Sequence, residues 1–497
     1  MTAVIDTADD GRRSALRAHE WRLLIGGALR PALEGRTYAT ESPADGLHLA
    51  DVPDADQSDV AAAVAAGLDA YRDWAAVSVR ERAAALRRLA GVLRANVDEL
   101  AYLDTIDCGH PYHVMQGDVE HAADVLDIYA DWSLQLGGET VPVSPEHLHY
   151  TVREPWGVVA KIVPYNHPIM FCASRIAAPL LAGNAVIVKA PHQTPLSALR
   201  MGELFSDELP RGLLSVLTGA GPATGEALVR HRDIRRIGFI GSVPTGQAIL
   251  KTAAESGIKS VSLELGGKNA MIVFPDSDPV AAASAAVRGM NFHWSAGQSC
   301  GSTSRLLLHE SVYDEVVDRV AEQVDGIHTG DLFDPRTGMG AVVSNAQYNK
   351  VMYYIGAAIE DGASLRTGGG RPDDKDAGYW IRPTVFAEVR PEHRVAREEI
   401  FGPVLSVMRW RSEEEAIALA NSVPYGLTAA IWTRDIARAH RVARQIDAGF
   451  VWINDVARHF IGVPYGGFKD SGIGTEESIA DLRSYTQTKA INVSLST

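Results

Sequence analysis

The sequence predicts an α/β protein whose parallel sheets are covered by helices, and two observations favour this class. From about Gly157, apolar segments rich in Val and Ile alternate with helical segments, and a second alternating region runs from near Asn269 to about residue 470. Strands of a sheet that is buried on both faces are typically such continuous apolar runs. The 497 residues suggest a multidomain chain, since a typical domain has ~150 residues.

Composition and charge exclude several classes of protein. Hydrophobic residues make up 46% and charged residues 22% of the chain, close to the average for globular proteins. The net charge of −15 disfavours binding to nucleic acid or to an anionic membrane surface. The longest apolar stretch, Ile176 to Val188, is interrupted by Pro179 and Asn184 and is too short for a membrane span. We therefore expect neither nucleic acid nor a membrane as a partner.

The chain has three cysteines, Cys108, Cys172 and Cys300, which are too few for a disulfide framework. Cys172 lies in an apolar run typical of a core, whereas Cys108 lies in a polar turn-like segment without a visible role. Scarce cysteines fit a reducing compartment, and the acidic N-terminal segment lacks the apolar core of a signal peptide. We therefore expect a cytoplasmic location. Because no CxxC motif or Cys/His cluster is present, no metal site is predicted.

The N-terminal part predicts helices from the spacing of its apolar residues. Ser58 precedes a run of apolar residues at helical spacing up to Trp74. Ser78 and Glu81 form an S-x-x-E capping box, which predicts the start of a second helical run that continues to about Leu100.

The β/α alternation predicts the elements that follow. Helices are expected up to Leu181, from about Pro195 to Glu208, and up to about Ser256. Strands are expected at 157–163, 185–189, 213–219, 236–242, 261–265 and 271–274.

Two segments predict strands outside this alternation, 147–153 (HLHYTVR) and 489–497 (KAINVSLST). An isolated strand at a sheet edge exposes unpaired backbone groups. Pairing across subunits would satisfy these groups in a homo-oligomer, which is the interpretation we favour. Edge pairing within one chain is the alternative.

Two residues are candidates for chemistry on a reactive carbonyl. Cys300 lies among small residues in GQSCGSTSR at 297–305, where a tight turn would leave the thiol accessible. It becomes a useful nucleophile if a proton acceptor or a positive charge produces the thiolate. Glu264 ends a predicted strand before two glycines, and it is either a satisfied structural carboxylate or a general base in a cleft.

Two turns are candidates for ligand binding. Asn166, in PYNHP at 164–168, follows a predicted strand, where open α/β sheets bind ligands, although Asn-x-Pro is also an ordinary turn signal. The segment GFIGSVPTG at 238–246 joins a strand to a helix and can offer backbone N–H groups to a pyrophosphate. It differs from the G-x-G-x-x-G fingerprint, so by itself it only suggests such a site.

Taken together, these stretches resemble the aldehyde dehydrogenase superfamily, from about residue 20 to the end of the chain. The order and spacing of seven segments carry the resemblance. They are PYNHP, VIVKAP, GFIGSVPTG, LELGGK, GQSCGSTSR, EEIFGPV and PYGGFKDSGIG.

The resemblance implies three catalytic residues. Cys300 attacks the aldehyde carbonyl, and the oxyanion is held by the Asn166 amide and the Cys300 N–H. The thiohemiacetal gives a hydride to the nicotinamide, and Glu264 activates the water that hydrolyses the resulting thioester to a carboxylic acid. Lys268 is expected to be a structural or electrostatic neighbour.

The resemblance also implies NAD as cofactor. Lys189 matches the residue that binds the adenosine ribose, and Gly241, Ser242 and Gly246 match the pyrophosphate turn. Glu399 matches the acceptor for the nicotinamide ribose, and Phe401 matches the wall beside the nicotinamide ring. Many NAD-preferring relatives carry a glutamate where this chain has His192. NADP is therefore the alternative, because the charge that repels a 2′-phosphate is missing. A second departure is Ile240, where relatives commonly have threonine.

The substrate tunnel is implied near seven residues, which are His121, His167, Met170, Ser174, His459, Phe460 and Tyr465. Several relatives have aromatic side chains at the positions of His167, Ser174 and His459. The small Ser174 leaves room, and the histidines add polarity. We therefore expect a bulky or polar aldehyde, such as an aromatic or hydroxylated one.

The implied architecture has three parts. A Rossmann-like cofactor-binding domain spans 1–133 and 154–264, an α/β catalytic domain spans 265–475, and a small β oligomerisation element joins 134–153 with 476–497. A homodimer or homotetramer is expected. One alternative function is a CoA-acylating dehydrogenase, which typically lacks the glutamate matched by Glu264. The other is a non-catalytic structural or binding protein, which the presence of Cys300 disfavours.

Overall fold

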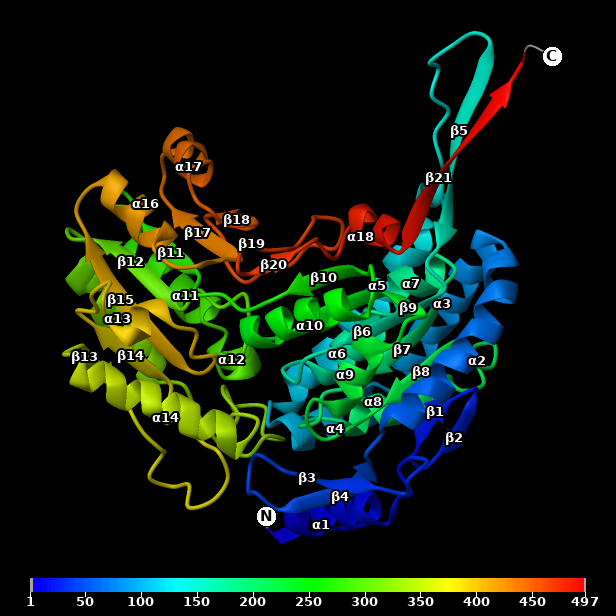
Figure 1. Cartoon of the computed structure of the whole chain (residues 1–497). Helices are drawn as coiled ribbons and strands as arrows, with labels where there is room; N and C mark the ends of the chain where they lie inside the picture. The colour runs from blue at the N-terminus through cyan, green and yellow to red at the C-terminus, as the bar shows by residue number, and fades with distance from the viewer. Residues whose placement is uncertain (1–2, 496–497) are drawn as a thin grey trace.

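The computed structural model describes residues 3–495, with side chains from Gly11 onward. Two lobes, each built around a sheet, lie side by side, and a long two-stranded ribbon projects from one of them (Figure 1). The first described element is helix α1 (Ala3–Ala18), and a small hairpin pairs β3 (Thr37–Glu41) with β4 (His48–Pro53). The α/β class predicted from the sequence is confirmed.

The first lobe contains an eight-stranded sheet. Its strands, in spatial order, are β2 (Ala28–Arg30), β1 (Leu23–Ile25), β8 (Leu214–Leu217), β7 (Ala185–Lys189), β6 (Val158–Ile162), β9 (Ile234–Ile240), β10 (Ser260–Glu264) and β20 (Gly472–Ile473). Strands β6 to β10 are parallel, β1 and β20 run antiparallel to them, and the edge strand β2 pairs antiparallel with β1. The five predicted strands between 157 and 265 are therefore confirmed.

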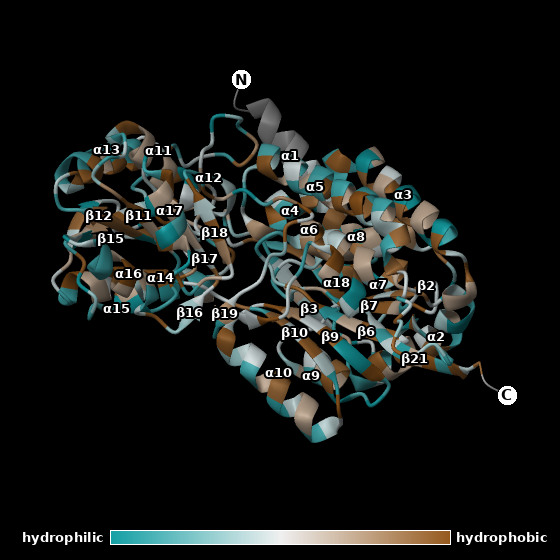
Figure 2. Cartoon of the chain, turned by 90° about the horizontal axis from the view of Figure 1, so that it is seen from above, coloured by the Kyte–Doolittle hydropathy of each residue, from teal (hydrophilic) through white to brown (hydrophobic). Residues whose placement is uncertain are grey.

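Helices cover both faces of this sheet, and the apolar strands lie between the two helical layers (Figure 2). On one side α2, α9 and α10 pack together, and on the other α7 and α8 contact the strands beneath α3, α4 and α5. The helices of this lobe are α2 (Gln57–Ala76), α3 (Val79–Ala95), α4 (Val97–Cys108), α5 (Tyr112–Asp131), the 3₁₀ turn η1 (Trp132–Leu136), α6 (Pro168–Ser174), α7 (Ala177–Leu181), α8 (Leu196–Phe205), α9 (Ala223–Arg230), α10 (Val243–Ser256) and α18 (Ile479–Ser484).

The predicted capping box starts α3. The Ser78 hydroxyl accepts from the Glu81 N–H at 3.3 Å, and the Glu81 carboxylate accepts from the Ser78 N–H at 3.2 Å. The next helix, α4, ends at Cys108, whose side chain is fully buried. Cys108 is thus a core residue at a helix end, and Cys172 in α6 is buried as expected.

The second lobe contains a seven-stranded sheet that is parallel except for its first pair. In spatial order its strands are β13 (Ser364–Thr367), β14 (Thr384–Ala387), β15 (Val404–Trp410), β12 (Arg305–His309), β11 (Ala270–Val273), β17 (Thr428–Trp432) and β18 (Phe450–Ile453). Its helices are α11 (Pro279–Gly289), α12 (Phe292–Ser295), α13 (Tyr313–Asp325), α14 (Asn345–Glu360), α15 (Arg394–Arg397), α16 (Glu413–Asn421) and α17 (Ile436–Ala443).

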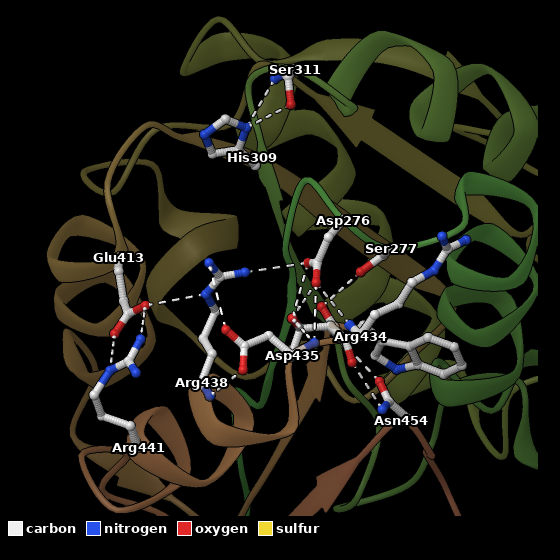
Figure 3. Close-up of polar contacts among 12 residues, drawn as sticks. Asp276, Ser277, His309, Ser311, Glu413, Arg434, Asp435, Arg438, Arg441 and Asn454 are labelled. Carbon is white, nitrogen blue, oxygen red and sulfur yellow. Dashed lines mark hydrogen bonds and ion pairs between the residues drawn. The ribbon is translucent and has the colours of Figure 1, made fainter.

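A polar network at the carboxyl end of β11 ties this sheet to α17. The Asp276 carboxylate accepts from the Thr433 hydroxyl and the Arg434 N–H, both at 2.9 Å, and it lies 3.5 Å from Arg438. Figure 3 shows how Asp435 and Arg438 gather around Asp276. The loops at the ends of two neighbouring parallel strands are fixed to each other in this way.

The C-terminal segment returns to the first lobe. The short strands β16 (Tyr425–Gly426) and β19 (Phe468–Lys469) pair with each other, and β20 then pairs with β10 although it lies within the range predicted for the catalytic domain. The ribbon consists of β21 (Thr486–Ser494) and β5 (His147–Pro155), paired antiparallel along nine residues. The two predicted outlying strands thus pair with each other within one chain. Among the described helices, none has the length and apolarity that crossing a bilayer requires.

Candidate active site

The carboxyl edge of the first sheet gathers several predicted site residues. Lys189, Ile240 and Glu264 are the last residues of β7, β9 and β10, and Ile240 pairs with Glu264 across the sheet. Asn166 follows the end of β6 by four residues. Because parallel strands end at the same edge, residues far apart in the sequence meet there, as ligand sites of α/β sheets require.

The loop that carries Cys300 depends on an unusual backbone. After α12, Ala296 and Gly297 both have positive φ, 50° and 71°. A Cβ atom at Gly297 would lie 2.4 Å from the carbonyl oxygen of Gly402. Only glycine fits this turn, which directs the chain back toward the first lobe and places Cys300 between the lobes.

Two amide side chains hold this loop. The Asn166 amide donates to the Gln298 carbonyl at 2.9 Å, and the Asn269 amide donates to the Cys300 carbonyl at 2.7 Å. The backbone around Cys300 is therefore anchored from both sheets.

Cys300 lies where two cavities meet. The first has a volume of about 210 Å³ and the second about 160 Å³. Both are lined by five shared residues: Asn166, Phe171, Ile240, Glu264 and Cys300. The three predicted catalytic residues are thus brought together, with one cavity on each side of the thiol.

The surroundings of Cys300 oppose formation of a thiolate. Burial above all, with a smaller contribution from the nearby carboxylates of Glu264 and Glu399, raises the pKa of the thiol to about 12. The Tyr465 hydroxyl, 3.8 Å from the sulfur, acts in the opposite direction. At neutral pH the thiol therefore needs a proton acceptor or a positive charge before it can attack.

Glu264 is a buried carboxyl without a hydrogen-bond partner. Its side chain is 5% exposed, and neither oxygen is bonded within the described residues. Burial raises its pKa well above the usual range, the Glu476 carboxylate adds to this, and Arg175 opposes it. A carboxyl in such surroundings can take up a proton near neutral pH, as a general base must.

The first cavity reaches the N-terminus of α10. Gly241 and Ser242 line it, and the Ser242 hydroxyl caps the helix by accepting from the Thr245 N–H at 3.4 Å. A Cβ at Gly246, in the first turn, would lie 2.9 Å from Leu265. The open end of this 14-residue helix could hold an anion such as a pyrophosphate.

Lys189, the last residue of β7, and His192, three residues later, do not line this cavity. The Lys189 ammonium donates to the Gly219 carbonyl at 3.2 Å, and burial lowers its pKa to about 8. Desolvation and the neighbouring Lys189 lower the pKa of His192 as well. His192 is therefore largely neutral at pH 7.

Glu399 and Phe401 form the opposite wall of the first cavity. The Glu399 carboxylate accepts from the Gly267 N–H at 2.9 Å, and a Cβ at Gly266 would lie 2.1 Å from it. Phe401 has a φ of 57° and lies edge-on to Tyr165, with ring centroids 6.0 Å apart. An acceptor beside an apolar wall could hold a ribose and the flat ring attached to it, so the residues present fit a dinucleotide.

Five of the seven residues predicted for the substrate tunnel line the second cavity. They are His121, His167, Met170, His459 and Tyr465. Ser174 is buried in α6, and Phe460 is 50% exposed; neither lines the cavity. Ser174 is packed inside the protein, although Arg175, the next residue, does line the cavity.

The sequence did not indicate several charged and aromatic residues of this cavity. They are Phe171, Arg175, Trp294, Glu476 and Glu477. Arg175 pairs with Glu476 and with Glu477, each at 3.0 Å, and Glu476 also pairs with Lys161 at 3.0 Å. In the sequence, two adjacent glutamates after GIGT could have indicated a charged site. Their position in the cavity, however, depends on the return of the chain to the first sheet.

Asp118 positions two rings of the second cavity. One oxygen of its carboxylate lies 2.7 Å from Nδ1 of His167, and the other accepts from the Trp294 N–H at 3.0 Å. The rings of His167 and Trp294 contact each other, with centroids 4.5 Å apart. This buried carboxylate therefore sets part of the cavity's shape.

Comparisons with known proteins agree with this geometry. Residues 31–491 match the model of the aldehyde dehydrogenase family. Aldehyde dehydrogenase tropH of Talaromyces stipitatus is 47% identical, over 92% of this chain and 90% of that protein. The NAD+ complex of an aldehyde dehydrogenase from Bacillus cereus superposes with a TM-score of 0.94 at 37% identity, covering 97% of this chain and 98% of the other.

A second solved structure is as similar. The P. syringae indole-3-acetaldehyde dehydrogenase AldA, in complex with NAD+ and IAA, has a TM-score of 0.95 at 37% identity and covers 98% of this chain and 99% of its own. Sequence motifs, the fold and the match over nearly the whole length lead to one conclusion: the chain belongs to the aldehyde dehydrogenase family.

Proposed function

We propose that this protein oxidises an aldehyde to the carboxylic acid with NAD, through a covalent intermediate on Cys300. The observation that carries the proposal is the position of Cys300 between two cavities. The first cavity has the Glu399 carboxylate that a nicotinamide ribose requires as a hydrogen-bond acceptor. The second cavity then remains for the aldehyde. The NAD+ complexes of the B. cereus and P. syringae relatives support NAD as the cofactor.

The residues divide the reaction into two steps. The Cys300 thiolate adds to the carbonyl carbon, and the Asn166 amide, with the Cys300 N–H, donates to the oxyanion; one such donor is worth about 10²–10³ in rate. NAD, when bound, supplies the hydride acceptor. Glu264 then takes a proton from water, the hydroxide attacks the thioester carbon, and the acid leaves as Cys300 regains its thiol.

A neutral His192 gives NADP no advantage over NAD. A 2′-phosphate carries negative charge, and a neutral imidazole gives it no ionic partner. Because the pKa of His192 is lowered, the ring carries little charge at neutral pH. Lys189, whose charge lowers the pKa of His192, donates to the Gly219 carbonyl.

The second cavity favours a bulky or polar aldehyde. Histidines and the ring of Trp294 line it together with Met170. The relative from P. syringae is named for an aromatic aldehyde. A kinetic panel tests this proposal: kcat/KM for benzaldehyde and hydroxylated aldehydes should exceed that for acetaldehyde, and the opposite order would refute it.

Glu264 favours hydrolysis of the Cys300 thioester over transfer of its acyl group to CoA. A CoA-acylating enzyme needs no base for water, and here a buried carboxyl lines both cavities beside Cys300. In assays with CoA present, we expect the free acid as the product; acyl-CoA formed in preference to acid would reverse this.

We propose a homodimer or homotetramer joined through the ribbon of β5 and β21. Leu148 and Val493 on this ribbon, and Leu495 just beyond it, are at least 39% exposed. The outer edge of β21 pairs with no other described strand and can therefore take up a partner strand. Light scattering after size exclusion tests the oligomer, and Leu148→Lys should weaken it. We also propose a cytoplasmic location, where the Cys300 thiol stays reduced.

Replacement of the nucleophile tests the whole proposal. Cys300→Ser should reduce aldehyde oxidation by at least about 10³-fold, while NAD binding, measured by calorimetry, persists. Cys172→Ala, a change at a buried cysteine outside both cavities, is the matched control and should stay active. Full activity of Cys300→Ser would refute the role of this thiol.

A further inference from the structure

A short chain of side chains leads from Cys300 to a buried ion pair. The Tyr465 hydroxyl lies 3.8 Å from the Cys300 sulfur, and the rings of Tyr465 and His459 are 4.4 Å apart. A Cβ placed on Gly301 would lie 3.3 Å from the Tyr465 oxygen and 3.8 Å from Nε2 of His459. The two polar atoms therefore converge beside the residue that follows the nucleophile.

Glu477 fixes the orientation of His459. Its carboxylate lies 3.4 Å from Nδ1 of His459, and its other oxygen accepts from Arg175 at 3.0 Å. With Nδ1 directed at a carboxylate, Nε2 is the nitrogen left to accept a proton. Glu477 holds this place with a φ of 62°, a conformation that non-glycine residues rarely adopt and that clusters at functional sites.

Charged groups of both signs surround His459. Glu477 pairs with it, whereas Arg175 and His121, which line the same cavity, oppose a further positive charge. Arg175 is already compensated by Glu476 as well as Glu477. Among the described residues that influence Cys300 most strongly, the carboxylates raise its pKa and Tyr465 alone lowers it.

We propose that Glu477 and His459 form a positioning pair that activates Cys300 through Tyr465. The S–H bond of Cys300 breaks, the Tyr465 hydroxyl accepts this proton and passes its own, through one bridging water, to Nε2 of His459, and Glu477 stabilises the imidazolium. The products are a thiolate and a protonated histidine, and Tyr465 stays neutral. This inference rests on the proposed role of Cys300 as nucleophile.

Alkylation of Cys300 by iodoacetamide tests the pair without NAD or aldehyde. Cys108 and Cys172 are fully buried, so the modification should map to Cys300 and be lost in Cys300→Ser. We expect His459→Phe to shift the pH profile of alkylation to higher pH by about one unit, which is a tenfold slower reaction at neutral pH. Glu477→Gln should shift it in the same direction by less, and Tyr465→Phe should match His459→Phe.

Control variants make the result decisive. His113→Phe, at an exposed histidine of α5, should leave the profile unchanged, and circular dichroism should show that each variant folds. Since Glu477→Gln preserves size, it replaces His459→Phe as the test if the latter does not fold. An unchanged profile in His459→Phe and Glu477→Gln overturns the proposal, and a shift in Glu264→Gln instead assigns the proton to Glu264. Alkylation of the thiol needs no turnover. The effect of His459 and Glu477 on Cys300 can therefore be measured even if the protein does not oxidise aldehydes.

Discussion

The side-chain amide of Asn166 donates a hydrogen bond to the backbone carbonyl of Gln298 at 2.9 Å. This bond joins the loop after β6 in the first lobe to the loop of Cys300, which leads into β12 of the second. An amide carries two hydrogens, so one remains for a ligand. Asn166 thus both holds the loop and presents a donor beside the thiol.

Removing this donor should slow the reaction strongly. Asn166→Asp keeps the size of the side chain but replaces both N–H donors with a carboxylate oxygen, which repels an oxyanion. We expect kcat to fall by about 10²–10³, with the Kd for NAD nearly unchanged by calorimetry. If kcat of Asn166→Asp stays within a few-fold of the wild type, Asn166 is not an oxyanion donor.

Glu264→Gln should separate the two chemical steps. The first turnover needs no water, so a burst of NADH should persist, while the steady-state rate falls because hydrolysis stalls. The pKa of Glu264 is raised, and the base form is lost as pH falls through this raised value. Steady-state kcat of the wild type should therefore decline on acidification at a higher pH than an ordinary glutamate would give. Stopped-flow absorbance of NADH measures the burst. If Glu264→Gln shows no burst and turns over as fast as the wild type, Glu264 does not activate the water.

The cofactor preference should respond to position 192. The wild type should have a higher kcat/KM with NAD than with NADP at neutral pH. His192→Glu should lower NADP use by about tenfold, ~1.4 kcal/mol, because a carboxylate repels the 2′-phosphate. Since the pKa of His192 is lowered, the ring gains charge only in acid, and relative NADP use should rise as pH falls. A wild-type preference for NADP above tenfold would overturn this expectation.

Asp118 should govern substrate binding more than chemistry. Asp118→Ala leaves the ring nitrogens of His167 and Trp294 without their acceptor, and each unpaired buried group costs about 1–3 kcal/mol. KM for an aromatic aldehyde should rise by about tenfold, with a smaller change in kcat. Asp124→Ala is the control on the same helix, because Asp124 pairs with Arg94 at the exposed surface. Equal kinetics in both variants would show that the rings do not need Asp118.

The network of Figure 3 should contribute to stability. Burial works against the Asp276 carboxylate, but hydrogen bonds from Thr433 and Arg434 outweigh it and lower its pKa. The stabilisation is therefore present at neutral pH and is lost as pH falls through the lowered pKa. Asp276→Ala should lower the free energy of unfolding by about 1–3 kcal/mol at pH 7, seen as a lower Tm.

A surface pair supplies the comparison for this change. Asp373 pairs with Arg382 and has a side chain that is 95% exposed, so Asp373→Ala should leave Tm nearly unchanged. Equal Tm values for Asp276→Ala and Asp373→Ala, or an Asp276 effect that persists in acid, would contradict the stabilising role.

The parts of the fold that the sequence predicts are local ones. The strands from β6 to β10 follow from runs of apolar residues, and the start of α3 follows from Ser78 and Glu81, three residues apart. Glu477 and Asp118 could not be found in this way, because their partners lie 302 and 49 residues away along the chain. Ser174 shows the related limit for a cavity: helical spacing places it on the same face as Met170, but only the packed structure shows that it is buried while Arg175 beside it lines the cavity.

The antiparallel pairing of β20 with β10 has a consequence for synthesis of the protein. Glu264 and Cys300 leave the ribosome long before Glu476 and Glu477, which follow β20 and complete the wall of the cavity beside them. A nascent chain can therefore form most of both lobes while the cavity beside its Cys300 thiol still lacks the wall formed by Glu476 and Glu477. Chains that stop before β20 should be inactive rather than merely less stable, so the enzyme switches on only with its final segment.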